Sequence, residues 1–271
     1  MGKEEVNKFL IGTSGWSYED WLGCFYPIGL KPNKFLWYYS QYFNTVEINF
    51  SYYRMPNRYV MKSIVKNVPR DFIFTVKLNS CFTHQKDLKN PYAEIPLKER
   101  DEFVIAIDVL KEKGMLDTIL SQFPQGFYFS QKNLEYVINL GRAFEGYNFA
   151  VEFRNNSWYN DIVYDVFRRE NFTFVSVDEP GIEGLPPREF IVTNPIAYVR
   201  LHSRNKSNWY RGEKLRYDYF YSDDELREWV QKINLNSTFD KVYCFFNNCH
   251  KGSAVKNALR FKEILEEAYG I

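Results

Sequence analysis

The chain has 271 residues, of which 45% are hydrophobic, 19% aromatic and 25% charged. This length and hydrophobic content suit one large globular domain with a sizeable core, and they exclude a disordered chain. The 35 Lys and Arg residues nearly balance the 34 Asp and Glu residues. Any binding of nucleic acid or of an anionic membrane must therefore come from a local patch.

The cysteines and the first residues bear on the cellular compartment. Cys24, Cys81, Cys244 and Cys249 show neither a CxxC pair nor a metal-ligand spacing, so we expect reduced thiols. The N-terminal segment lacks the apolar stretch and cleavage site of a secretory signal, and the chain lacks a run of about 18 apolar residues. We expect a soluble cytoplasmic protein that does not bind membranes.

Short apolar runs alternate with helix-like segments along the chain. The predicted strands are 8–14, 45–50, 72–79, 116–123, 149–153, 172–178, 197–202 and 241–247. The predicted helices are 33–43, 57–67, 98–113, 132–144, 161–170, 223–233 and 253–268. This alternation predicts parallel pairing of the strands.

Eight predicted strands in 271 residues match a single (β/α)₈ or TIM barrel that spans residues 1–271. A doubly wound open sheet is the alternative, but the segment "GTSGWS" lacks the third glycine of a dinucleotide-binding fingerprint. Three connections are long, namely 80–97, 179–196 and 203–222 after strands three, six and seven. Loops that follow barrel strands lie on the face that carries function.

Side chains in each predicted strand alternate between a helix-facing row and a barrel-facing row. The barrel-facing row is mostly polar: Thr45, Glu47, Asn49, Thr75, Lys77, Asn79, Gln122, Glu152, Arg154, Ser176, Asp178, Arg200, His202 and Asn247. A barrel interior is normally filled with branched apolar side chains. The row therefore predicts a ring of charges in which Glu47, Glu152 and Asp178 pair with Lys77, Arg154 and Arg200. An ion-pair network that only holds the barrel shut is the alternative.

Several motifs occur in a fixed order along nearly the whole chain. They are GTSGWSYEDW (12–21), FYPIG (25–29), TVEINFSYYRMP (45–56), FTVKLNSCFTH (74–84), SQFP (121–124), VEFRNNSW (151–158), RLH (200–202) and FFNN (245–248). In this order they resemble the domain of unknown function 72 family, also called YecE-like. The resemblance implies a TIM barrel and no particular reaction. Its barrel is similar to those of endonuclease IV and xylose isomerase, which is a likeness of fold only.

Motif matches to this family give a set of site residues. The set is Gly15, Trp16, Glu47, Asn49, Tyr53, Arg54, Lys77, Thr83, His84, Gln122, Glu152, Arg154, Trp158, His202 and Asn247. The chain departs from the family pattern at Ser203, where glycine more often follows the histidine.

The predicted site favours acid/base chemistry on an anionic ligand. The candidate catalytic residues are Glu47, Lys77, Glu152 and His202. The candidate ligand-binding residues are Trp16, Asn49, Tyr53, Arg54, His84, Gln122, Arg154, Trp158, Asp178, Arg200 and Asn247. The first hypothesis is an enzyme that hydrolyses a phosphodiester or glycosidic bond in a phosphate-bearing sugar, nucleotide or nucleic-acid ligand.

Three alternatives remain open. A non-catalytic protein could bind single-stranded nucleic acid through loop 203–220, which interleaves Arg204, Lys206, Arg211, Lys214 and Arg216 with Trp209, Tyr210, Tyr217 and Tyr219. An isomerase or aldolase could form a Schiff base at Lys77. A hydrolase like endonuclease IV could bind a divalent metal through His84 and His202 with Glu47, Glu152 or Asp178. Because competing cations share this space and the chain has only three histidines, we expect no cofactor.

Overall fold

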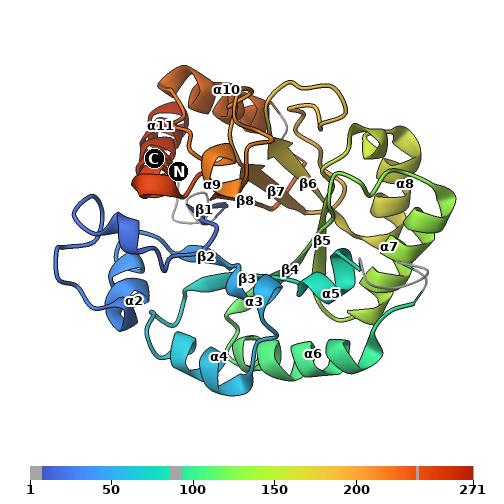
Figure 1. Cartoon of the computed structure of the whole chain (residues 1–271), viewed down its shortest axis with the longest axis horizontal. Coiled ribbons are helices and arrows are strands. Elements are labelled where there is room, and N and C mark those ends of the chain that lie inside the picture. The colour runs from blue at the N-terminus through green and yellow to red at the C-terminus, as the bar shows by residue number, and fades with distance from the viewer. Residues whose placement is uncertain (1–7, 86–91, 93, 236–237, 271) are drawn as a thin grey trace.

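The computed structural model describes residues 8–85, 92, 94–235 and 238–270. Its strands are β1 (Phe9–Thr13), β2 (Thr45–Ile48), β3 (Ile73–Lys77), β4 (Leu116–Gln122), β5 (Asn148–Glu152), β6 (Thr173–Asp178), β7 (Ile196–Leu201) and β8 (Lys241–Phe246). All neighbouring strands pair in parallel, in the order β1-β8-β7-β6-β5-β4-β3-β2. The predicted strands and the (β/α)₈ barrel are confirmed (Figure 1).

Helices surround the barrel, as Figure 1 shows. The α-helices are α2 (Phe35–Tyr39), α3 (Phe50–Tyr53), α4 (Arg58–Val65), α5 (Ser80–Thr83), α6 (Leu97–Lys111), α7 (Gln131–Ala143), α8 (Asp161–Glu170), α9 (Glu213–Arg216), α10 (Asp223–Asn234) and α11 (Ser253–Tyr269). Short 3₁₀ helices are η1 (Glu19–Trp21), η2 (Pro32–Lys34), η3 (Asn156–Trp158) and η4 (His250–Gly252). Each of the seven predicted helical segments contains a helix.

Local capping explains where helices begin. At the start of α10 the Ser222 hydroxyl accepts a hydrogen bond from the Glu225 backbone N–H (3.3 Å), and the Glu225 carboxylate accepts one from the Ser222 N–H (2.9 Å). This reciprocal pair satisfies two N–H groups that have no partner inside the helix. The charged end of α10 is thereby fixed where the long connection after β7 ends.

The barrel closes between β1 and β2. Ser14 bridges to Glu47 in parallel, and the Gly15 N–H donates to the Glu47 carbonyl (2.9 Å). Gly12 allows the close approach, because a Cβ at this position would lie 2.5 Å from the Thr45 carbonyl oxygen. Closure brings Glu47 beside the other inward residues at the strand ends.

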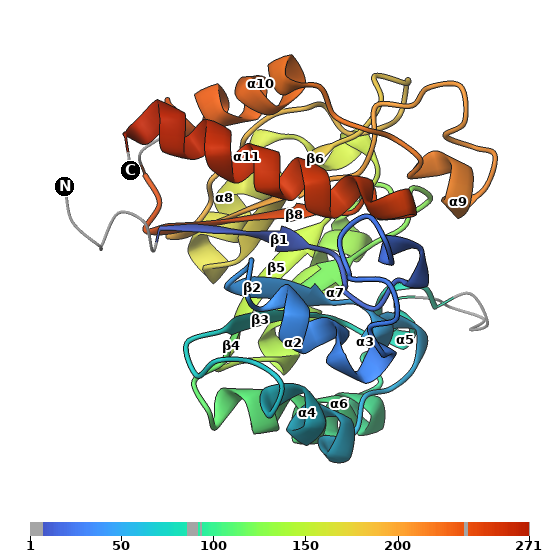
Figure 2. The ribbon, with the colours of Figure 1, turned by 90° about the vertical axis from the view of Figure 1, so that its left-hand side faces the viewer.

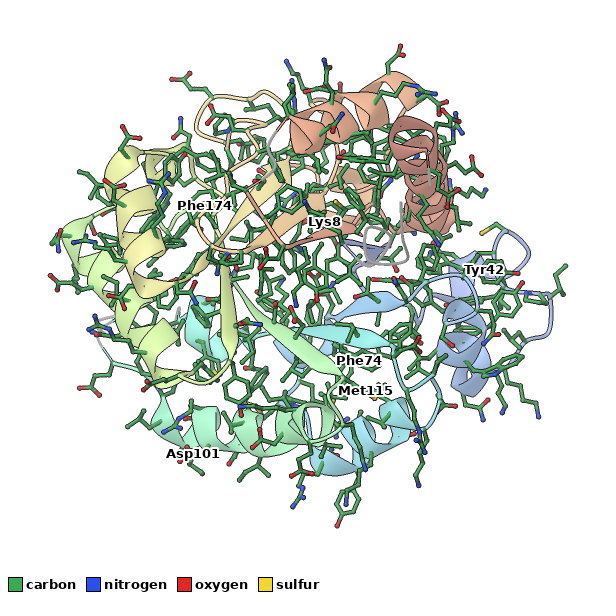
Figure 3. The ribbon with its side chains drawn as sticks, turned by 180° about the vertical axis from the view of Figure 1, so that it is seen from behind. Lys8, Tyr42, Phe74, Asp101, Met115 and Phe174 are labelled. Carbon is green, nitrogen blue, oxygen red and sulfur yellow. The ribbon has the colours of Figure 1, made fainter. Side chains whose placement is uncertain are left out.

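Apolar side chains form two layers. One lies between strands and helices, and Figure 3 shows Phe74 and Met115 there, with Asp101 on the outer side of α6. The other lies inside the barrel and contains Leu10, Leu120, Ala150, Val175, Val177, Ile196, Tyr198, Tyr243 and Phe245. The predicted inward direction of Ser176 and Asp178 is therefore wrong, because Val175 and Val177 face the axis of the barrel from β6.

The connections that follow the strands gather at one end of the barrel, where Figure 2 shows α3, α5 and α9. Of the three long connections, 179–196 contains no helix or strand before β7 begins at Ile196, and 203–222 contains α9. Part of the third, residues 86–91 and 93, lies outside the described residues. Within the described chain, no helix has the length and apolar character needed to cross a lipid bilayer.

The packing between α7 and the segment before β6 predicts the effect of Gly141→Ala. A Cβ at Gly141 would lie 2.1 Å from Cζ of Phe172, which is buried. We expect overpacking to lower the free energy of unfolding by about 1–3 kcal/mol, although helix propensity alone favours alanine by about 1 kcal/mol. Urea denaturation measures the change.

Gly126→Ala is the matched control, because Gly126 lies in an exposed turn with open space around its Cα. Its effect should stay within about 1 kcal/mol. Equal stabilities of the two variants would contradict the packing of Phe172 on α7.

Candidate functional site

Arg200 lies at the centre of the charged layer above the apolar barrel interior. Its Nη2 is 2.7 Å from Glu47 Oε1, and its Nη1 is 2.5 Å from Glu152 Oε2. The same Nη2 donates to the Ser14 hydroxyl (3.2 Å). All four side chains are buried. The guanidinium on β7 thus connects β2, β5 and the end of β1. The alternation of side chains along the strands predicts that Glu47, Glu152 and Arg200 all face the barrel interior.

Arg154 forms the second half of this layer. Its Nε donates to Glu152 and its Nη1 donates to Glu179, so Glu152 lies between two guanidinium groups. Glu179, which follows β6, is fully buried and was not among the predicted site residues. We call Glu47, Glu152, Arg154, Glu179 and Arg200 the charge ring.

Asp178 does not belong to the charge ring, which corrects the sequence-based prediction. Its carboxylate accepts hydrogen bonds from Arg204 Nη2 (2.6 Å), Tyr221 OH (3.1 Å) and Trp229 Nε1 (2.6 Å). Since Trp229 is on α10, Asp178 points to the helix layer. The residue next to it, Glu179, takes the inward position, because a shift of one residue reverses the face of a strand.

His202 lies buried beside the ring. Its Nε2 is 3.2 Å from Glu152 Oε1, and its Nδ1 is 3.0 Å from Asn247 Nδ2 and 3.5 Å from Arg154 Nη2. Burial and the charge of Arg154 hold the pKa of His202 well below its usual value, so the imidazole is neutral. Two donors face Nδ1, which assigns the proton to Nε2, the nitrogen nearer Glu152.

Lys77 ends β3 and reaches the same space from the opposite wall. Its Nζ donates to Gln122 Oε1 (2.8 Å) and lies 4.3 Å from the centre of the Tyr52 ring. Burial, together with the charge of Arg200, lowers the pKa of Lys77 to about 7. The amine is therefore divided between its charged and neutral forms near neutral pH.

The two carboxylates bound to Arg154 differ in their pKa. Burial raises the pKa of Glu152, but the charges of Arg154 and Arg200 together outweigh it and hold the pKa well below the usual value. Burial also raises the pKa of Glu179, here to about 7, because the charge of Arg154 offsets only part of the effect. Glu152 stays ionised, whereas Glu179 can take up or release a proton near neutral pH.

A cavity of about 230 Å³ opens above the ring at the carboxyl ends of the strands. The predicted residues that line it are Asn49, Tyr53, Lys77, His84, Gln122, Arg154, Arg200 and Asn247. Further lining residues are Tyr18, Tyr52, Glu179, Trp209, Arg216 and Tyr217. The structure thus brings together eight of the predicted side chains around one hollow.

Other predicted residues lie elsewhere. Glu47, Glu152 and His202 are buried behind the cavity wall. Trp158 is buried in the helix layer, where it stacks on Phe153 at 3.9 Å and donates to the Phe127 carbonyl (2.6 Å). Arg54 is exposed outside the cavity, and Trp16 lines an adjoining groove.

Loop 203–220 is partly folded into the cavity wall. Arg216 and Tyr217 line the cavity together with Trp209, whose carbonyl accepts a hydrogen bond from Arg216 Nε (2.7 Å). Arg204 is bound to Asp178, while Lys206, Arg211 and Lys214 are exposed. Two of the five bases are therefore engaged within the protein, and three are exposed.

One group of possible metal ligands lies in the described part of the chain. Glu152, Glu179 and His202 offer ligand atoms within 4.8 Å of one another. Arg154 donates to both of these carboxylates, so a guanidinium already supplies the positive charge between them. The residues present therefore fit an internal cation better than a metal ion, which would have to displace Arg154. His84, predicted as a ligand, bonds with the Thr83 hydroxyl (2.9 Å).

Fold and site together define a (β/α)₈-barrel protein with a charged cavity at the carboxyl ends of its strands. The family model described as "Protein of unknown function DUF72" matches residues 10–270. The chain belongs to the DUF72 family, as its motifs indicated.

Individual relatives agree with this assignment. The UPF0759 protein YunF of Bacillus subtilis (strain 168) is 30% identical in an alignment that is 277 positions long and covers 96% of this chain and 95% of that protein. A DUF72 family crystal structure from Thermotoga maritima is 41% identical, with a TM-score of 0.87, and covers 95% of this chain and 99% of that one. Another from Enterococcus faecalis V583 is 27% identical, with a TM-score of 0.83, and covers 95% of each chain.

Removal of the central guanidinium should destabilise the fold. Arg200→Met leaves Glu47 and Glu152 buried without their shared partner, and we expect a loss of about 3–5 kcal/mol in the free energy of unfolding. Arg168→Met is the control, because its pair with Asp165 is exposed and should contribute less than about 1 kcal/mol. Urea denaturation compares the two, and equal losses would contradict the central role of Arg200.

The raised pKa of Glu179 predicts a pH dependence of stability. The folded state holds a proton at this carboxyl up to about pH 7, whereas the ordinary pKa of glutamate is 4.5. Protonation at Glu179 therefore contributes fully to stability below pH 4.5, and this contribution is lost as the pH rises to about 7. Glu179→Gln should remove a decline of up to about 3 kcal/mol from the profile of unfolding free energy.

Glu266→Gln is the control for this profile, because Glu266 is exposed on α11. It should keep the decline of the wild-type protein between pH 4.5 and 7. A Glu179→Gln profile that matches the wild-type one would show that Glu179 does not titrate in this range.

Proposed function

We propose that the chain is an enzyme that binds a small phosphate-bearing ligand, a sugar phosphate or a nucleotide, and hydrolyses it by acid/base chemistry. The observation that carries the proposal is the composition of the cavity wall. Lys77, Arg154, Arg200 and Arg216 line it against a single carboxylate, Glu179. A cavity with this excess of cations favours an anionic ligand.

The cations divide into two kinds. Arg154 and Arg200 are ion-paired with Glu47, Glu152 and Glu179, so they hold the wall together more than they attract an anionic ligand. Lys77 has one amide partner, Gln122, and an ammonium group has three donors. A bound phosphate would favour the charged form of Lys77, so its arrival raises the pKa of the amine and draws a proton into the site.

Glu179 supplies the proton-transfer group. Its pKa of about 7 lets it act as acid or base at neutral pH. One of its oxygens accepts from Arg154, whereas no hydrogen bond reaches Oε2 among the described residues. Glu47 and Glu152, the carboxylates first expected to be catalytic, are ion-paired behind the wall and would position Arg154 and Arg200.

Neutral groups complete the ligand site. Asn49, Gln122 and Asn247 offer amides on the wall, and the rings of Tyr52 and Trp209 lie among them. Amides suit the hydroxyl groups of a sugar, and aromatic faces suit its apolar ring face or a base. The volume of about 230 Å³ suits a ligand of the size of a sugar phosphate.

Calorimetric titration with ribose 5-phosphate tests the binding role of Lys77. Lys77→Met should weaken the affinity about 10- to 100-fold, the value of a hydrogen bond to a charged group. Lys256→Met, which removes an exposed lysine of α11, should leave the affinity unchanged. Wild-type protein that binds no phosphate ligand would contradict the proposal.

Turnover of p-nitrophenyl phosphate esters, phosphodiesters and glycosides tests the role of Glu179. Glu179→Gln should lower kcat about 10²- to 10⁴-fold while the dissociation constant changes little. Full activity in this variant would exclude Glu179 as the proton-transfer group. Salt-dependent binding of single-stranded DNA without turnover, lost when Arg211 and Lys214 are neutralised, would instead support a nucleic-acid-binding protein.

A further inference from the structure

An open groove adjoins the cavity on the side of β1 and β2. It has a volume of about 220 Å³, and Trp16, Tyr18, Asn49, Phe50 and Tyr53 are among its lining residues. Tyr18, Asn49 and Tyr53 line both hollows. The two hollows therefore adjoin, and these three side chains form the surface that they share.

The groove differs from the cavity in its chemistry. Its surface is almost entirely apolar, whereas the surface of the cavity is mainly polar. The Tyr18 hydroxyl is engaged by the Ser14 carbonyl (2.6 Å). The groove thus offers ring faces and few hydrogen-bonding groups. The hydroxyl groups of a sugar would lack hydrogen-bond partners in this groove. The face of a flat aromatic ring needs no such partners.

The backbone holds this surface in place. Gly15 has a φ of +89°, which favours glycine, and a Cβ there would lie 2.9 Å from the Tyr18 hydroxyl. The Gly15 N–H is bound to the Glu47 carbonyl, and the Trp16 carbonyl accepts from Tyr26 OH (2.6 Å). The backbone at Trp16 is therefore held by hydrogen bonds on both sides, which favours a groove that is formed before a ring binds.

An edge-on aromatic contact and a cation–π contact connect the groove to Lys77 in the cavity. The Tyr53 ring meets the Tyr52 ring edge-on at 4.9 Å, and Lys77 Nζ lies 4.3 Å from the centre of the Tyr52 ring. The change from charged to apolar surface thus takes place across two neighbouring residues of α3. A ligand that uses both hollows needs its anionic group and its ring close together.

We infer that the groove is a subsite for an aromatic ring, a nucleobase or an aryl group, joined to the phosphate-bearing part held in the cavity. The inference rests on the proposed function and specifies its ligand class as phosphate esters that carry an aromatic ring. The groove would contact the face of a nucleobase and has few polar groups that could hydrogen-bond to its edge. It would therefore accept different bases.

Calorimetric titration of the wild-type protein compares four probes: inorganic phosphate, ribose 5-phosphate, phenyl phosphate and adenosine 5′-monophosphate. The ring-bearing probe of at least one pair, phenyl phosphate over phosphate or the nucleotide over ribose 5-phosphate, should bind about 5- to 100-fold more tightly. A gain in the first pair assigns an aryl group, and a gain in the second assigns a nucleobase.

Trp16→Leu tests the position of the ring, because it keeps an apolar side chain and removes the aromatic face. The ratio of affinities for ring-bearing and ring-free probes should fall to near one, Trp16→Phe should restore most of it, and Trp37→Leu, on the exposed side of α2, should keep it. The inference would be overturned if the ring-bearing and ring-free probes bind equally in both pairs, or if Trp16→Leu keeps the wild-type ratio of their affinities. Either result would leave the proposed binding of phosphate ligands intact. Failure of all four probes would overturn the proposed function together with it.

Discussion

Two guanidinium groups and three carboxylates share the interior of one barrel, and this charge ring is the constraint on which the site depends. An ion withdrawn from water costs several kcal/mol unless paired in good geometry. Arg200 meets that condition with Glu47 and Glu152, and Arg154 meets it with Glu152 and Glu179. The pairs join β2, β5 and β7 to the residue after β6, so only a closed barrel can form them. The apolar layer below supports the ring, since Tyr198 OH donates to Glu47 (2.7 Å).

The ring also determines which groups can exchange protons. Glu152 has two guanidinium partners and stays ionised. Glu179 is paired with Arg154, and burial raises its pKa to about 7. The net effect on Lys77 is a lowered pKa, because burial and the charge of Arg200 outweigh the attraction of the carboxylates. One set of fixed charges thus produces two titrating groups on the wall of the same cavity. A carboxyl group with a raised pKa beside an amine with a lowered pKa is typical of sites that perform acid/base chemistry.

Much of the barrel could be predicted because its signal is local. Apolar runs and helical periods identify the eight strands and the seven predicted helices, but not the four-residue helices α3, α5 and α9. The alternation of side chains correctly predicts that Glu47, Lys77, Glu152 and Arg200 face the barrel interior. Alternation failed at β6, where both rows of "FVSVDE" begin with an apolar residue and end in an acid. Only the partners, Arg204 and Trp229 for Asp178 and Arg154 for Glu179, decide between the rows. These partners lie on a loop, on a helix and in the segment after β5, which no pattern within β6 can show.

The same limit explains why the proposed catalytic groups moved from the centre of the ring to its edge. Residue type and strand position can identify a carboxylate that faces the axis of the barrel, as they do for Glu47 and Glu152. They cannot show which cations and hydrogen-bond donors surround it, and these decide whether it keeps its charge or exchanges a proton. Glu152 is an anchor because two arginines bind it, and Glu47 is one because it binds Arg200 and also accepts a hydrogen bond from Tyr198 OH. Glu179 forms its ion pair with Arg154, and no hydrogen bond from the described residues reaches its Oε2. In this ring, the carboxylate with an oxygen that lacks a partner is the one that chemistry can use.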